Sequence, residues 1–588
     1  MAVRRNVLQE EDILCELYAD TRSDVSDYSD NENLDSDSDS DVTTSSCKQL
    51  RSSVVVPSDS ETSTVDEECS EAENSDETTG DVWCKTDKKP SNEPFLGTTG
   101  LNIVIDNHES VVEVVSSIIG DDLIQLLTEQ SNLYHSQNAE KWKVSPKTLK
   151  WSNITPEEMR KFLGLIILMG QVRKKYIRDY WSTDPTISTP IFPHTMSRNR
   201  FQSIWQAWHF SDNRQQTQDS GRLFKIWPMY EYFVQKFRSV YNPKRELSLD
   251  EAMIPWRGRL KFRTYNPGKI TKYGVLVRMV CEAVSGYICN MEIYSAEGKK
   301  LEETVLSLLD RNLGQNHHIY QDNFYNSVGL AQTLLERDVR VCGTMRANRG
   351  IPRDLEEDGK RLKRGQSAFR RKGDVMVQVW RDKRLVRMIS TIHDTTVVST
   401  GRKDRKTNVE IKKPCSVVQY NKFMKGVDRA DQYLSYYSVL RKTVKWSKKV
   451  VLYLLNCALF NAFFVYRTLN RNKNVKYKNF LHEVGRSWIS EAQNQSESNS
   501  DDLQLPEKQP TPRGPKQDPP GRLSGDFRVH KLEKIVGGGE GKRKYPARQC
   551  KVCAAHKKRS ETRYICKFCV VPLHKGSCFE KYHSVKNY

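Results

Sequence analysis

The sequence predicts a mixed α/β core between two helical segments, followed by a small metal-binding module. Three observations carry this prediction. Residues 246–348 alternate with a period of two, as strands do. Helical periodicity precedes this stretch from 96 and returns after it to about 490. Five of the 14 cysteines fall in the last 39 residues, with histidines between them. Strands followed by a strand–helix–strand unit are typical of a mixed sheet covered by helices.

Charge is divided unevenly along the 588 residues, whose net charge is +19. Residues 21–80 contain 17 acidic and 3 basic side chains, so we expect residues 1–95 to form a disordered acidic tail. The remaining chain is strongly basic, which favours a polyanionic partner, first nucleic acid and second an anionic membrane. A mean hydropathy of −0.68 excludes a polytopic membrane protein. Because the first residues lack an apolar stretch typical of a secretion signal, we expect a reducing compartment.

The expected segments follow these changes of pattern along the chain. They are the acidic tail (1–95), a first helical segment (96–245), a strand-rich core (246–348), a basic, turn-rich insertion (349–415), a return to the core (416–437), a second helical segment (438–504), a Pro- and Gly-rich flexible linker (505–544) and a cysteine-rich module (545–588).

Capping and apolar period predict the helices. The sequence Thr-Pro-Glu-Glu at 155–158 is a capping box with proline at the first helical position. Further helices are expected at 196–211, where aromatic residues cluster as core, and at 223–240. The apolar stretch at 450–466 includes two asparagines and is shorter than a membrane span requires, so we interpret it as a buried helix.

Period-two alternation predicts the strands. Strands are expected at 247–256 and 317–322, with a hairpin around Ser285-Gly286. A helix at 326–338 and a strand at 339–346 complete a strand–helix–strand unit. Residues 256–265 also alternate, which predicts a strand with four basic side chains on one face: Arg257, Arg259, Lys261 and Arg263.

Candidate catalytic residues are carboxylates at the edges of predicted elements. They are Asp250, Asp322, Asp428 and Asp431. Because long stretches of chain separate the first three, only the tertiary fold can gather them. The last two are three residues apart and share a helix face. Gathered carboxylates suit Mg²⁺, and two such ions can activate a nucleophile and stabilise a leaving oxygen. Taken by themselves, these aspartates are a weak signal, because the chain has many carboxylates and most carboxylates are solvated surface.

Several ordered blocks resemble the piggyBac family of DNA transposases. They are LSLDEAMIPWRGR at 247–259, IYQDNFYNS at 319–327, YNKFMKGVDRADQYLSYYSVLRKTVKW at 420–446 and CFEKYH at 578–583. The resemblance implies an RNase H-like DDE catalytic core with an insertion. It also implies that the flanking helical segments form a joint dimerisation and DNA-binding domain.

The resemblance also implies an activity and its residues. The catalytic triad falls on Asp250, Asp322 and Asp428, with Asp431 as an additional ligand of Mg²⁺ or Mn²⁺. Activated water nicks the transposon end, the freed 3′-OH forms a hairpin, and the reopened end joins a TTAA target. Trp446 aligns with a tryptophan near the hairpin tip, although a core position is the alternative. The basic residues at 257–263 would neutralise DNA phosphates, unless they only protect an edge strand.

The C-terminal cysteines and histidines have the spacing of zinc ligands. The candidates are Cys550, Cys553, His556, Cys566, Cys569, His574, Cys578 and His583, enough for two tetrahedral Zn²⁺ sites. Their pairing stays open in the sequence; the resemblance implies an interleaved cross-brace that binds the transposon ends. Residues 541–588 carry 13 Lys/Arg against 2 Glu, which favours DNA. A RING-type ubiquitin ligase or a histone-tail reader is the alternative.

The sequence as a whole favours a nuclear, metal-dependent transposase that acts as a dimer or larger assembly on transposon-end DNA and a TTAA target. Basic clusters at 541–548 and 556–559 are candidate nuclear-localisation signals. Two alternatives stay open: a transposase-derived DNA-binding protein that has lost cleavage, and a chromatin or ubiquitin-pathway adaptor built around the zinc module.

Overall fold

The chain forms two compact units, residues 1–500 and 501–588. The computed structural model describes residues 54–55, 82–142 except 92, 151–403, 408–498, 522–523, 530–535 and 547–586. The predicted acidic tail and flexible linker lie largely outside the described residues.

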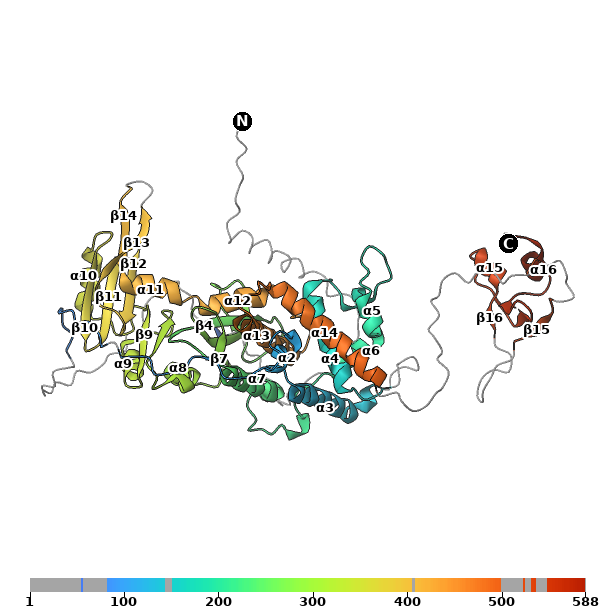
Figure 1. Cartoon of the computed structure of the whole chain (residues 1–588), viewed down its shortest axis with the longest axis horizontal. Helices are drawn as coiled ribbons and strands as arrows, with labels where there is room; N and C mark the ends of the chain where they lie inside the picture. The colour runs from blue at the N-terminus through green and yellow to red at the C-terminus, as the bar shows by residue number, and fades with distance from the viewer. Residues whose placement is uncertain are drawn as a thin grey trace, which may run out of the picture. The chain divides into compact units, whose positions relative to one another are not determined.

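Helices of the first unit come from both sides of the strand-rich region (Figure 1). Those before it are α2 (Val111–Ser116), α3 (Asp121–Gln137), η1 (Ala139–Trp142), α4 (Pro156–Gln171), η2 (Ile177–Trp181), α5 (Ile191–Thr195), α6 (Arg198–Ala207), η3 (Asn213–Gln215), η4 (Phe224–Ile226) and α7 (Trp227–Val240). Those after it are α13 (Trp446–Leu469) and α14 (Tyr477–Ser498).

Local sequence explains how the first long helix begins and packs. Thr155 Oγ1 accepts a hydrogen bond from the Glu158 N–H at 3.2 Å, and Pro156 is the first residue of α4, as predicted. Gly164 allows α14 to approach closely, because a Cβ there would lie 3.0 Å from the carbonyl oxygen of Gly485. The α4–α14 contact joins segments more than 300 residues apart.

The predicted buried helix at 450–466 lies within α13. This helix is long and apolar enough to cross a membrane by length and composition, but 89% of its most apolar window is buried inside the unit. Its asparagines are hydrogen-bonded in the core: Asn456 Nδ2 donates to Leu434 O at 2.7 Å, and Asn461 Nδ2 donates to Ile288 O at 3.0 Å. The structure therefore agrees with a core helix.

A mixed sheet forms the centre of the first unit. Its strands run in the order β1-β5-β6-β4-β8-β9-β12-β11-β10, and β7 also pairs with β6. Strand β4 pairs antiparallel with β6 and parallel with β8, which in turn is parallel to β9. The bounds are β1 (Val54–Val55), β4 (Glu246–Pro255), β5 (Thr264–Tyr265), β6 (Tyr273–Glu282), β7 (Ile288–Ile293), β8 (His317–Gln321) and β9 (Val339–Thr344), with α8 (Leu301–Leu309), η5 (Asp310–Asn312) and α9 (Val328–Leu335) between strands. The predicted mixed α/β core is present.

The basic segment predicted as a strand at 256–265 is mostly loop. Only Thr264 and Tyr265 are in a strand, and residues 256–263 form an irregular turn between β4 and β5. Packing overrides the alternation here: Gly258 lies against Trp256, while Phe262 turns into the core at 2% exposure. The predicted basic strand face at 257–263 is therefore wrong.

The insertion extends the sheet and adds a separate ribbon. Strands β10 (Ser367–Lys372), β11 (Val375–Arg381) and β12 (Leu385–Ser390) form an antiparallel meander that pairs with β9. Strands β13 (Val397–Lys403) and β14 (Glu410–Pro414) pair with each other as a two-stranded sheet, and Figure 1 shows them projecting beside the meander. Helix α10 (Arg353–Arg361) precedes β10, and α11 (Cys415–Phe423) and α12 (Gly426–Ser435) follow β14 and lead back to the core.

The second unit consists of short elements around a cysteine cluster. It contains β15 (Leu532–Lys534), β16 (Arg548–Gln549), α15 (Lys551–Ala555), β17 (Glu561–Thr562), β18 (Tyr564–Cys566), β19 (Val571–Pro572) and α16 (Ser577–Ser584). In the first unit, β2 (Gly100–Leu101) and β3 (Tyr241–Asn242) form a further two-stranded sheet.

Candidate functional site

Two of the predicted aspartates meet at the centre of the sheet. Asp250 lies on β4, and Asp322 directly follows the neighbouring parallel strand β8. Together with Glu251 they form a group whose ligand oxygens lie within 4.8 Å of one another. The parallel β4–β8 pairing thus gathers carboxylates that are 72 residues apart in the chain.

Backbone contacts fix these carboxylates. Asp250 Oδ1 accepts a hydrogen bond from the Glu251 N–H at 2.7 Å, and Asp322 Oδ1 accepts one from the Phe324 N–H at 2.8 Å. Behind them, Asn326 Nδ2 donates to the carbonyl oxygens of Gln321, Asp322 and Thr344. The turn that carries Asp322 is therefore tied to both β8 and β9.

Helix α12 presents the other two aspartates to the same region. Its first residue, Gly426, allows close packing on β4, since a Cβ there would lie 2.1 Å from Ser248 Oγ. Asp428 is exposed on the first turn, and Asp431 is partly buried one turn later. Both carboxylates act electrostatically on Asp250, but neither belongs to the 4.8 Å group.

Crowding of carboxylates in a buried place raises their pKa values. Burial, followed by the charges of Asp250 and Asp322, raises the pKa of Glu251 to about 7. Burial raises the pKa of Asp322 to about 6, with Asp250 contributing. Burial, together with the charges of Asp250 and Asp428, raises the pKa of Asp431 to about 7 against the opposing effect of Lys269. A site of this kind favours a bound cation.

Glu251 and Lys269 belong to this carboxylate site but were not among the sequence candidates. The carboxylate of Glu251 lies in the same group as that of Asp250, although adjacent residues of a regular strand usually face opposite sides. Lys269 lies in the turn between β5 and β6, where its Nζ is 3.7 Å from Asp250 Oδ1. The motif Asp-Glu at 250–251 was visible in the sequence; nothing in it indicated the position of Lys269.

The donor set fits a hard divalent cation. All three grouped side chains offer carboxylate oxygens, and Glu251 is only 6% exposed. Mg²⁺ and Mn²⁺ prefer oxygen ligands of this kind. Asp250, Glu251 and Asp322 could hold such an ion, and Asp428 and Asp431 lie on the neighbouring helix.

The residues predicted to contact DNA lie in two places. Arg257, Arg259 and Lys261 are exposed in the loop after β4. Arg263 is partly buried, and its Nη1 donates to the carbonyl oxygen of Arg257 at 3.0 Å. Trp446, the first residue of α13, is partly buried and packs edge-on against Phe262, with ring centroids 5.3 Å apart. This contact joins the basic loop to the start of α13.

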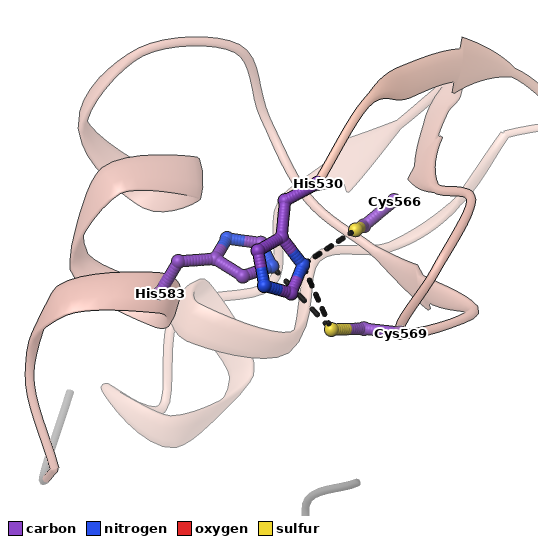
Figure 2. Close-up of side chains that lie close together, drawn as sticks. All are labelled: His530, Cys566, Cys569 and His583. Atoms are coloured by element: carbon purple, nitrogen blue, oxygen red, sulfur yellow. Dashed lines mark hydrogen bonds between the residues drawn. The ribbon is translucent and has the colours of Figure 1, made fainter. Parts of the chain in front are cut away.

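The second unit contains two groups of four Cys/His side chains, each close enough together to hold one metal ion. One group is His530, Cys566, Cys569 and His583, which Figure 2 shows converging on one point. The other is Cys550, Cys553, His574 and Cys578. Neighbouring ligand atoms are 3.5–3.8 Å apart, close to the edge lengths expected around one Zn²⁺. The two groups alternate along the chain, as a cross-brace does.

The eighth residue of the two groups is His530, and not His556, which was the eighth candidate from the sequence. His556 is the exposed C-cap of α15 and belongs to neither group, whereas His574, also a sequence candidate, has its Nδ1 3.6 Å from Cys553 Sγ. His530 immediately precedes β15, and that strand pairs with β18, which ends at Cys566. The signal was hidden because His530 falls in the predicted linker, 20 residues before the first cysteine of the module.

Known proteins resemble this chain in sequence and structure. A family model described as Transposase IS4 matches residues 111–463. The PiggyBac transposable element-derived protein 3 of Homo sapiens is 26% identical over 392 residues, which cover 63% of this chain and 63% of that protein. The human PiggyBac transposable element-derived protein 2 is 24% identical over 443 residues, with 71% of each chain covered. A cryo-EM structure of the piggyBac transposase synaptic complex with hairpin DNA has a TM-score of 0.61 at 21% identity, covering 82% of this chain and all of that one.

Proposed function

Because the chain belongs to the Transposase IS4 family, with piggyBac-type relatives, we propose that it is a DNA transposase that cuts and joins phosphodiester bonds at its carboxylate site. The observation that carries this proposal is the meeting of Asp250 and Asp322 on adjacent parallel strands beside α12. A mixed sheet with carboxylates at this position supports an RNase H-like DDE core.

In this proposal Asp250, Asp322 and Asp428 are the catalytic triad, and Asp431 and Glu251 complete the ligand set. Bound Mg²⁺ or Mn²⁺ supplies charge stabilisation for in-line displacement at phosphorus. The protein's own contribution is to fix the carboxylates: the sheet and the Asn326 hydrogen bonds hold Asp250 and Asp322, while α12 brings Asp428 and Asp431. Fixed ligands avoid reorganisation during the reaction.

The proposed reaction is cut-and-paste transposition. A water molecule nicks the transposon end, the freed 3′-OH attacks the opposite strand to form a hairpin, and the reopened end joins a TTAA target. Each step displaces one phosphodiester oxygen by another, so a single carboxylate site suffices. The exposed cations Arg257, Arg259 and Lys261 and the nearby Trp446 would contact the DNA backbone and an unpaired base.

The second unit is proposed to bind two Zn²⁺ ions and to recognise the transposon ends. Its ligands would be four Cys/His side chains for each ion, and so small a unit gains much of its stability from the metal. Exposed basic side chains in the turn after α15, namely Lys557, Lys558 and Arg559, would attract DNA.

A dimer or larger assembly in the nucleus completes the proposal. Two ends must be held together for paired excision, which one active site per chain cannot accomplish alone. Of the candidate import signals, residues 541–546 lie outside the described part of the chain, while 556–559 are exposed. Alanine replacement of both clusters should leave a fluorescent fusion cytoplasmic; continued nuclear accumulation would place the signal elsewhere.

Plasmid excision in cells tests this function. The plasmid carries the element's own ends flanked by TTAA, and wild type is compared with Asp322→Ala. We expect precise repair to TTAA with wild type and none with the variant. Failure of wild type to excise, despite nuclear protein that binds the ends, would favour a transposase-derived DNA-binding protein. Capture of a ubiquitin-conjugating enzyme or a histone peptide, without end binding, would favour an adaptor.

A further inference from the structure

A lysine lies inside the carboxylate site. Lys269 Nζ is 3.7 Å from Asp250 Oδ1 and donates a hydrogen bond to the carbonyl oxygen of Glu251 at 3.0 Å. Its side chain is 34% exposed, compared with 15% for Asp250, so the ammonium group reaches inward from the edge of the site. An ammonium ion at this distance competes with a metal ion for the same oxygens.

The backbone around Lys269 is built to keep it there. Asn266 is buried, its Oδ1 accepts a hydrogen bond from the Gly268 N–H at 3.1 Å, and its N–H donates to Lys272 O at 2.8 Å. The Lys269 N–H also donates to the Asn266 carbonyl oxygen at 3.4 Å. This closed turn brings the lysine to the middle of β4, where Asp250 and Glu251 lie, whereas Lys272 of the same turn is exposed.

The positive charge reaches the site through two contacts of one side chain. The Lys269 ammonium group pairs with Asp250 Oδ1 and also donates to the carbonyl oxygen of Glu251. Both contacts are to β4, which carries two of the three grouped carboxylates. An ammonium group paired with carboxylates is charged at neutral pH, so it offsets part of their repulsion.

We infer that Lys269 is a built-in counter-ion that keeps the carboxylates gathered before a divalent cation binds, and that it gives way when the cation enters. This inference rests on the proposed metal-dependent function. It makes Lys269 a positioning residue: it stabilises the metal-free protein and weakens metal binding. Once displaced, a flexible four-carbon side chain with a full positive charge is free to contact a phosphate of the incoming DNA.

Metal-dependent thermal stability of the purified full-length protein tests the inference. Melting temperature is measured at pH 8 over a titration of MgCl₂ for wild type, Lys269→Met, Lys269→Arg and the matched control Lys272→Met. We expect Lys269→Met to melt below wild type without metal and to reach half of its Mg²⁺ stabilisation at a concentration lower by about five-fold or more. Lys269→Arg, which keeps the charge, and Lys272→Met should follow wild type.

The possible results separate this inference from the function on which it rests. If Mg²⁺ stabilises wild type and Lys269→Met with the same midpoint, the counter-ion role is refuted while the metal site stands. If Mg²⁺ leaves wild type unchanged, both the metal site and the role of Lys269 are overturned. Should Lys269→Met fail to fold, Lys269→Gln retains a hydrogen-bond donor toward Glu251 O and gives the same comparison.

Discussion

Replacing Asp322 by asparagine should abolish excision and yet stabilise the metal-free protein. The change removes one charge and keeps the shape of the side chain. The asparagine Oδ1 can still accept the 2.8 Å hydrogen bond from the Phe324 N–H, so the turn after β8 is preserved. What disappears is a carboxylate crowded against Asp250 and Glu251.

The size of the effect follows from the raised pKa of Asp322. Burial and the charge of Asp250 raise it from 3.8 to about 6, which corresponds to about 3 kcal/mol of unfavourable ionisation in the folded state. A raised carboxyl pKa stabilises the protein at low pH, and this stability is lost as pH rises through about 6. At pH 8 the variant should therefore be more stable by about 2–3 kcal/mol, and near pH 4 the difference should shrink.

Urea unfolding of the metal-free proteins at pH 4.5 and pH 8 measures this difference. The gain should appear at pH 8 and shrink or reverse when MgCl₂ is present, since wild type then gains a ligand that the variant binds more weakly. If Asp322→Asn destabilises the metal-free protein at pH 8, then Asp322 is not crowded against other carboxylates. That result would refute a metal site formed by Asp250, Glu251 and Asp322.

Further predictions concern the metal module, the DNA-binding residues and the aromatic pair. His530→Ala should lose about one of the two zinc ions per chain, whereas His556→Ala should retain both; mass spectrometry of the native protein measures the zinc content. The His530→Ala module should also become more sensitive to proteolysis. Arg257, Arg259 and Lys261 can be replaced together by alanine, and DNA binding measured over a range of salt concentrations. The plot of log binding constant against log salt concentration should become less steep by about 0.9 for each DNA phosphate that the variant no longer neutralises. An unchanged slope would exclude binding of the DNA backbone by these residues. Trp446→Ala should weaken binding of a hairpin end by about 1–3 kcal/mol while intact duplex binding changes less; equal weakening of both would favour a purely structural role.

Elements with a strong local signal could be predicted from the sequence. The capping residue Thr155 and the proline after it indicated where α4 begins. The strand expected at 247–256 corresponds to β4, and the first strand of the hairpin expected around Ser285-Gly286 corresponds to β6. The long apolar stretch in α13 was correctly separated from a membrane span by its asparagines, both of which are paired in the core. In each case a few neighbouring residues determine the result.

Features that depend on tertiary packing could not be predicted in this way. Residues 256–263 alternate like a strand, but the packing of Trp256 and Phe262 into the core bends them into a loop. Lys269 approaches Asp250 only because the turn after β5 folds back over β4. His530 joins a metal group because β15 pairs with β18, a pairing across more than 30 residues.

The carboxylate group at Asp250 and Asp322 was predicted in part. Both residues were candidates because they stand at the edges of predicted elements, and the resemblance placed the triad on them; the parallel β4–β8 pair explains why they meet. Glu251 was not among the candidates, and regular strand alternation would place it on the face opposite Asp250. The tightly grouped set is therefore Asp250, Glu251 and Asp322, whereas the resemblance emphasised Asp428, which is exposed on α12.

Strand cleavage by the purified protein tests the central claim most directly. The substrate is a labelled duplex that carries a transposon end next to TTAA, and the reaction is run with MgCl₂ or with EDTA, for wild type and for Asp250→Asn. The account predicts a nick at the transposon end followed by a hairpin product, formed only by wild type and only with the metal. Binding of the duplex without any cleavage by wild type in MgCl₂ or MnCl₂, or cleavage that persists in Asp250→Asn, would contradict it.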